Sequence, residues 1–156
     1  HMSSAANNAE RRLARDLQRY GLSEGGGILR PSPAEPMLDF IVAWGTGSNP
    51  LGPVYRPPTS DLAWRAVTSR RALGFIEARS IGLKSTGRVT SPLRGEARRV
   101  LALPFARQEG GSLEMRVLKL VTPSRSLDLR QVSDLMRQWG CHPVGWGDTA
   151  GVPQAR

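Results

Sequence analysis

The sequence predicts a small α+β domain in which an antiparallel sheet, built round a central hairpin, is packed by two or three helices. Two apolar, β-rich runs at residues 98–106 and 113–121 flank a short glycine-containing segment, which is typical of a hairpin. Apolar residues recur at helical spacing near residues 61–79 and 127–139, which predicts helices there. A chain of 156 residues is long enough to bury a core in one domain.

The chain begins with His1, interpreted as a tag remnant, and then a basic helix expected at residues 9–20. Asn7 or Asn8 is the expected N-cap and Gly21 the expected stop. Apolar residues recur at i, i+4 and i+7 on one side of this helix and arginines project from the other: Leu13, Leu17 and Tyr20 against Arg11, Arg12, Arg15 and Arg19.

Glycines and prolines in residues 23–36 predict a linker, so the basic helix is expected on a flexible arm. The domain organisation is then residues 1–36 for tag remnant, helix and linker, 37–148 for a single α+β domain, and 149–156 for a flexible tail. The short apolar run at residues 37–44 favours a strand, although one or two buried helical turns remain an alternative.

A long extended loop is expected at residues 45–58, which hold several glycines and prolines. Thr59 or Ser60 would cap the helix at 61–79, which Gly74 would split in two if it interrupts the apolar pattern. A polar, turn-rich stretch follows at residues 82–95, with a short strand expected at 88–90.

The two hairpin strands carry apolar residues at successive positions, so we expect them to be central and covered on both faces. Pro104 has no N–H to donate, so we expect its end of the first strand to lie at a sheet edge or in a bulge. Ser124 or Ser126 is the expected cap of the last helix, and Gly140 its stop.

Charge is the strongest functional signal. The 22 basic residues exceed the 13 carboxylates by nine, and all but Lys84 and Lys119 are arginine. GC-rich coding bias explains the preference for arginine over lysine, but it does not explain the excess of cations, which favours a polyanionic partner. The candidate contact residues are Arg11, Arg12, Arg15, Arg19, Arg65, Arg70, Arg71, Arg79, Arg98 and Arg99, with Arg107 and Arg116 near the hairpin.

The leading hypothesis is a non-enzymatic nucleic-acid-binding protein that grips phosphates with arginine forks, RNA being favoured over DNA. The predicted strands offer only Phe105 as an aromatic surface, which argues against reading a single strand base by base. A basic surface that meets an acidic protein is the alternative. A homodimer is compatible with the sequence, and no cofactor is implied.

Three tryptophans adjoin glycine, at Trp44-Gly45, Trp139-Gly140 and Gly145-Trp146-Gly147. Spaced Trp-Gly dipeptides resemble the hooks by which some silencing proteins and viral suppressors engage Argonaute pockets. This resemblance implies a protein-binding adaptor, including a viral or phage component that recruits a host factor. Trp146 is its best carrier, because Trp139 lies on the apolar face of the expected helix.

Cys141 beside His142 invites a nucleophile-and-base interpretation, but neighbours in a chain usually point apart, so a packing role for Cys141 is favoured. One cysteine and one native histidine cannot fill the four positions of a zinc site. The lone cysteine and the lack of an apolar run of membrane-spanning length predict an intracellular, cytoplasmic protein without a membrane partner.

One enzymatic resemblance concerns Arg56, Ser85-Thr86-Gly87 and then Glu109 or Glu114. Their order resembles the Arg, Ser-Thr-Ser, Glu order of ADP-ribosyltransferase toxins, with glycine in place of the second serine. The resemblance implies an arginine that holds the phosphates of a nicotinamide cofactor and a glutamate that stabilises an oxocarbenium-like transition state.

Overall fold

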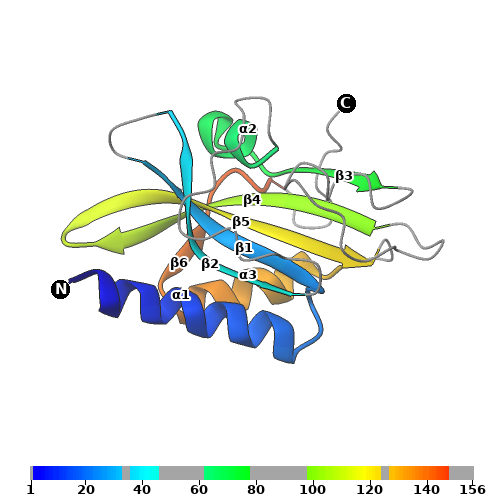
Figure 1. Ribbon diagram of the computed structural model, residues 1–156, viewed down its shortest axis with the longest axis horizontal. Helices are drawn as coiled ribbons and strands as arrows, with labels where there is room; N and C mark the ends of the chain where they lie inside the picture. The colour runs from blue at the N-terminus through cyan, green and yellow to red at the C-terminus, as the bar shows by residue number, and fades with distance from the viewer. Residues whose placement is uncertain (1, 33–35, 46–61, 78–97, 124–126, 148–156) are drawn as a thin grey trace.

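A six-stranded antiparallel sheet is covered by α1 and α3 on one face and by α2 on the other (Figure 1). The computed structural model describes residues 2–32, 36–45, 62–77, 98–123 and 127–147. Within these ranges the elements are α1 (Met2–Arg19), β1 (Gly25–Pro31), β2 (Leu38–Gly45), α2 (Leu62–Ser69), β3 (Leu73–Glu77), β4 (Arg98–Glu109), β5 (Ser112–Pro123), α3 (Leu129–Gln138) and β6 (Cys141–Pro143). The strand order is β2-β1-β5-β4-β3, and β6 pairs with β4. The predicted α+β class is therefore confirmed.

Helix α1 begins at Met2, so neither Asn7 nor Asn8 caps it as expected. Its end agrees with the prediction. Gly21 has a φ of +68°, and the Leu22 N–H donates to the carbonyl of Leu17 at 2.9 Å. This pattern is a Schellman motif, in which glycine adopts the left-handed conformation that closes the last turn.

The predicted linker is wrong, because the glycine run forms part of β1, which lies between β2 and β5. A Cβ at Gly27 would lie 2.5 Å from Cε1 of Phe40, so the absence of a side chain lets β1 pack against its neighbours. The flexible arm is corrected as well: Leu13 and Leu17 are fully buried, and α1 is held against the sheet.

The strand expected at residues 37–44 is confirmed as β2, whereas the single helix expected at 61–79 is wrong. Helix α2 ends at Ser69, and Arg70 takes a left-handed φ of 55° that breaks the helical path. Residues 73–77 then extend and pair with β4 as β3. Tertiary pairing outweighs the local helical pattern there. The expected caps Thr59 and Ser60, the rest of the loop and the strand at 88–90 lie outside the described residues.

The predicted hairpin is confirmed and is longer than expected, with β4 and β5 paired from Arg98↔Pro123 to Glu109↔Ser112. Its turn is Gly110-Gly111, whose φ angles are +58° and +85°, as a tight two-residue hairpin turn requires. Pro104 lies opposite Val117 of β5. On the other side of β4, β3 pairs only as far as Ala102 and β6 starts at Phe105, so the missing N–H of Pro104 interrupts no pairing.

Helix α3 is capped by Asp128, whose Oδ1 accepts hydrogen bonds from the backbone N–H groups of Arg130 at 2.9 Å and Gln131 at 3.4 Å. Asp128 therefore takes the role expected of Ser124 or Ser126, which lie outside the described residues. Gly140, with a φ of +73°, ends the helix as predicted. The short strand β6 after it was not predicted.

Each face of the sheet has its own hydrophobic cluster. The face under α1 and α3 includes Leu17, Ile28, Phe105 and Met136. The cluster under α2 includes Leu29, Ala66, Val100 and Val117. Both faces of β4 and β5 are covered, as the successive apolar residues of these strands predicted.

Candidate nucleic-acid interface

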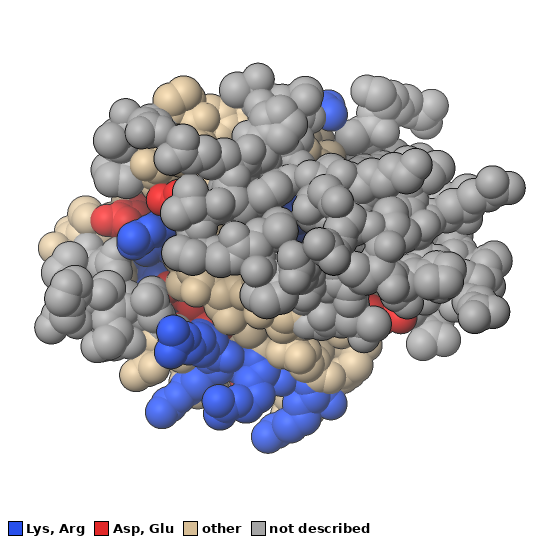
Figure 2. All heavy atoms as spheres, in the orientation of Figure 1, with Lys and Arg blue, Asp and Glu red and all other residues tan. Residues whose placement is uncertain are grey.

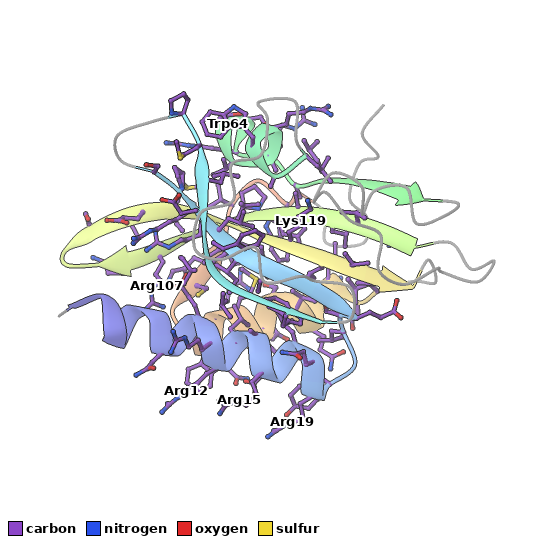
Figure 3. The ribbon with its side chains drawn as sticks, viewed as in Figure 1. Arg12, Arg15, Arg19, Trp64, Arg107 and Lys119 are labelled. Carbon is purple, nitrogen blue, oxygen red and sulfur yellow. The ribbon has the colours of Figure 1, made fainter. Side chains whose placement is uncertain are left out.

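Four arginines form a row along the outer side of α1, named here the arginine row: Arg11, Arg12, Arg15 and Arg19. All four are exposed, whereas Leu13, Ala14 and Leu17 of the same helix are buried against the sheet. At about 100° per residue the arginines centre opposite this buried side. The side chains of Arg12, Arg15 and Arg19 point away from the body of the molecule (Figure 3), and basic atoms gather over α1 in the space-filling view (Figure 2).

The arginine row lies beside two aromatic rings. The guanidinium carbon of Arg12 is 5.5 Å from the ring centroid of Trp139, and that of Arg19 is 5.2 Å from the ring centroid of Tyr20. Arg19 also donates to the Tyr20 hydroxyl at 3.2 Å, and this hydrogen bond raises the pKa of Arg19 above its ordinary value. Arg19 therefore keeps its charge at neutral pH.

A hydrogen bond ties α1 to α3 beside this row. The indole N–H of Trp139 donates to Oδ2 of Asp16 at 2.9 Å. Trp139 also packs against the core, as the sequence predicted. Asp16 is half-buried and engaged with the indole, and the arginines of the row form no ion pair with it or with any other described residue.

The inner side of α1 is fixed by a buried ionic cluster. Glu10 is fully buried, with one carboxylate oxygen 3.4 Å from Nε of Arg116 and the other 3.7 Å from Nε of Arg107. Arg116 also binds Glu114 at 3.0 Å, and Arg107 donates to the Trp139 carbonyl at 3.2 Å. Arg107 and Arg116, expected near a nucleic-acid surface, are thus used inside the protein.

The other predicted contact residues within the described ranges do not join the arginine row. Arg65, Arg70 and Arg71 are exposed on or just after α2, which covers the opposite face of the sheet. Arg98 and Arg99 lie at the start of β4, where Arg99 is half-buried. Arg79 lies outside the described residues. The expectation that one helix at 61–79 would carry four arginines is corrected, because the chain becomes a strand after α2.

Sequence reasoning missed two features of this site. Tyr20, which was assigned to the apolar stripe, is 50% exposed and lies beside Arg19. The second feature is the burial of Glu10, which occupies the same side of the helix as Leu13 and Leu17. Its helical position could have revealed its burial, since Glu10 precedes Leu13 by three residues and Leu17 by seven.

The Trp-Gly interpretation is contradicted for its best carrier. Trp146 is only 4% exposed, and its indole N–H donates to the carbonyl of Pro104 at 2.7 Å. Trp44 is 7% exposed within the core under α1. Neither indole can enter a pocket on a partner without unfolding its surroundings.

Cys141 and His142 point apart, since Cys141 is fully buried and His142 is exposed. Burial raises the pKa of the Cys141 thiol to about 11, so it stays protonated and unreactive at neutral pH. Among the described residues there is no group of three or more metal-ligating side chains.

Most residues of the ADP-ribosyltransferase resemblance lie outside the described structure, which therefore does not test it. Arg56 and residues 85–87 lie outside the described ranges. Glu114 is 44% exposed in its side chain and pairs with Arg116.

Neither a family model nor a curated protein sequence matches this chain. Among solved structures, the chain is similar to a methyl-accepting chemotaxis protein fragment, residues 122 to 287, with a TM-score of 0.52 and 20% sequence identity. The similarity covers 93% of this chain and 84% of that chain. At this identity the likeness concerns the fold alone. None of the helices within the described part of the chain is long and apolar enough to cross a membrane.

Proposed function

We propose that this chain is a non-enzymatic nucleic-acid-binding protein that contacts the phosphate backbone through the arginine row of α1. The observation that supports this most is the exposure of all four guanidinium groups on one side of a docked helix. None of them forms an ion pair with another described residue, so their charge is directed outward. An exposed cationic row attracts phosphates and releases their counterions on binding.

The spacing of the row suits a phosphate backbone. Arg11, Arg15 and Arg19 are four residues apart, so each step rises about 6 Å along the helix axis, which is close to the separation of neighbouring phosphates on one strand. Each guanidinium group can grip phosphate oxygens with two parallel hydrogen bonds. The buried contacts of Glu10 keep the row in place and lower the ordering cost of binding.

RNA is favoured over DNA in this proposal because of Tyr20. Half of its side chain is exposed at the end of the row, where a splayed base can stack on the ring while Arg19 holds the adjoining phosphate. Unpaired bases that can be splayed out are a feature of RNA loops and ends. A partner of this kind implies an intracellular location for the protein.

Fluorescence anisotropy with labelled single-stranded RNA, single-stranded DNA and duplex DNA, over a series of salt concentrations, tests the proposal. If the row contacts about four phosphates, the logarithm of the affinity should fall with the logarithm of salt with a slope of about −3. Arg11→Gln combined with Arg15→Gln should weaken binding and reduce this slope by about half. Arg65→Gln combined with Arg71→Gln removes the same charge from the opposite side and is the matched control.

Equal losses of nucleic-acid affinity in the two double variants would show that net charge, and not the arginine row, determines binding. Absence of salt-dependent binding in the unmodified chain would overturn the proposal. A protein partner recovered by pull-down after nuclease treatment, and lost in the row variant, would instead support the acidic-protein alternative. Tyr20→Ala should weaken binding of single-stranded RNA more than binding of duplex DNA.

A further inference from the structure

A concave site lies beside α3, away from the arginine row. It is an open cleft of about 490 Å³ between α3 and the segment that follows β6. Trp139, which contacts α1, follows Arg137 by two residues, so their side chains point about 160° apart round the axis of α3. Because Arg137 lines the cleft, the cleft lies on the side of α3 that faces away from α1. Its lining residues are Arg130, Ser133, Asp134, Arg137, Pro143, Gly145, Trp146 and Gly147.

The helical wall of the cleft presents three hydrogen-bond donors in one stripe. Arg130, Ser133 and Arg137 occupy positions i, i+3 and i+7 of α3 and all line the cleft. Ser133 is only 4% exposed, yet its hydroxyl makes no hydrogen bond to any described residue. The hydroxyl oxygen itself still reaches solvent, so it can donate a hydrogen bond to a ligand in the cleft. Neither arginine forms an ion pair with Asp134 in the described part of the chain.

The facing wall offers backbone N–H groups that have no partner in the described chain. Gly145 has a φ of +69° and Gly147 a φ of +60°, whereas the φ of Trp146 between them is negative. The N–H groups of these three residues make no hydrogen bond within the described chain.

This wall is fixed before any ligand binds. The carbonyl of Gly145 accepts a hydrogen bond from the Ala72 N–H at 3.0 Å, and a Cβ at Gly145 would overlap the carbonyl oxygen of Arg70. The carbonyl of Pro104 accepts from the Trp146 indole at 2.7 Å. The cleft is therefore preorganised, which reduces the entropic cost of binding.

We propose that this cleft binds the phosphate group of a phosphate monoester carried on a hydroxylated sugar. Two guanidinium groups, a hydroxyl and unpaired backbone N–H groups are the kinds of donor that a phosphoryl group requires. Asp134 lines the same cleft, where its carboxylate accepts a hydrogen bond from a hydroxyl group of the sugar. Its negative charge disfavours binding of a bare phosphate ion. A free sugar phosphate or nucleotide and the phosphorylated end of a nucleic-acid strand share this chemistry.

Isothermal titration of the full chain with ribose 5-phosphate, ribose and inorganic phosphate tests the site. Ribose 5-phosphate should bind more tightly than inorganic phosphate, and ribose should not bind. Arg130→Gln with Arg137→Gln should lower the affinity about tenfold or more, as expected when charge-assisted hydrogen bonds are lost. Arg11→Gln with Arg15→Gln, which removes the same charge from the arginine row, should leave it within about twofold, since distant sites act independently.

Two single variants separate a built site from general charge. Ser133→Ala should weaken ribose 5-phosphate binding without any change of net charge. Asp134→Asn should increase the affinity for inorganic phosphate. It should therefore reduce the ratio of the affinity for ribose 5-phosphate to the affinity for inorganic phosphate. Failure of ribose 5-phosphate to bind at millimolar concentration, or equal losses in the two arginine pairs, would overturn the proposal. Thermal melts of each variant establish that it is folded.

The source of the phosphate is assigned by comparing a 5′-phosphorylated trinucleotide with its 5′-hydroxyl form. Tighter binding of the phosphorylated trinucleotide than of ribose 5-phosphate assigns the cleft to strand ends, and weaker binding assigns it to a free metabolite. Either result supports the phosphate site. The experiment is independent of the arginine row, because Arg11→Gln with Arg15→Gln should leave ribose 5-phosphate binding unchanged.

Discussion

The carboxylate of Glu10 on α1 lies 3.4 Å from Nε of Arg116 on β5, and both side chains are buried. This contact joins the amino-terminal helix to the centre of the sheet. It also separates two kinds of arginine in the described chain, since Arg116 is ion-paired inside the protein while the arginine row of α1 faces solvent.

Replacing Glu10 should be strongly destabilising. Glu10→Gln removes the charge that compensates Arg116 and Arg107, and we expect a loss of about 3 kcal/mol or more in the free energy of unfolding, as for other broken buried ion pairs. Urea denaturation measures it. Glu114→Gln, which removes a 44% exposed partner of Arg116, is the control and should cost about 1 kcal/mol or less. Similar losses in both variants would mean that burial of Glu10 is unimportant.

Gly26 should tolerate no side chain. A Cβ at this position would overlap the carbonyl oxygen of Lys119 on the neighbouring strand, which is backbone and cannot rotate away. Gly26→Ala should therefore cost more than about 3 kcal/mol or prevent folding, in the range reserved for severe packing conflicts. At Gly111, in the hairpin turn, a Cβ meets nothing within 4 Å. Gly111→Asn should be tolerated, because asparagine adopts left-handed φ angles readily. Thermal denaturation of both variants would show the contrast; a stable, soluble Gly26→Ala protein would refute the close approach.

The Cys141 thiol should make stability depend on alkaline pH. Burial raises its pKa from 9.0 to about 11, so the folded state retains a proton that the unfolded chain releases above pH 9. The contribution of the protonated thiol to the free energy of unfolding is fully present below pH 9 and is lost as the pH rises through 11. For a shift of this size the total loss is about 3 kcal/mol. Urea denaturation of the wild type and of Cys141→Ala at pH 8 and pH 11 isolates the effect. The wild type should lose more stability than the variant, and parallel losses would contradict the assignment.

Asp128 should contribute about 1 kcal/mol as the N-cap of α3. Its Oδ1 accepts hydrogen bonds from the N–H groups of Arg130 and Gln131, which otherwise have no partner in the helix. Asp128→Ala should lower the free energy of unfolding by about this amount. Asp128→Asn retains an acceptor oxygen and should lose much less. An equal loss in the two variants would indicate that charge near the helix end, and not capping, is responsible.

The sequence by itself determined the local features of this protein. Glycine at positions 21 and 140 ends two helices because it adopts the left-handed conformation at little cost, and Gly110-Gly111 supports a tight hairpin turn for the same reason. The α+β class followed from the apolar periods, and the outward direction of the arginine row followed from its helical spacing. Each of these depends on residues close together in the chain.

Only the tertiary structure decided which segments pair and which charges are buried. The local sequence predicts a linker at the glycines of β1, but Phe40 and Lys119 on the neighbouring strands pack against them. It predicts a helix at residues 73–77, but these residues pair with β4 as a strand. Arg116 and Arg11 are the same residue type, yet one meets Glu10 inside the protein and the other faces water. Strand pairing and charge burial depend on residues distant in the chain, whose contacts the local sequence pattern does not specify.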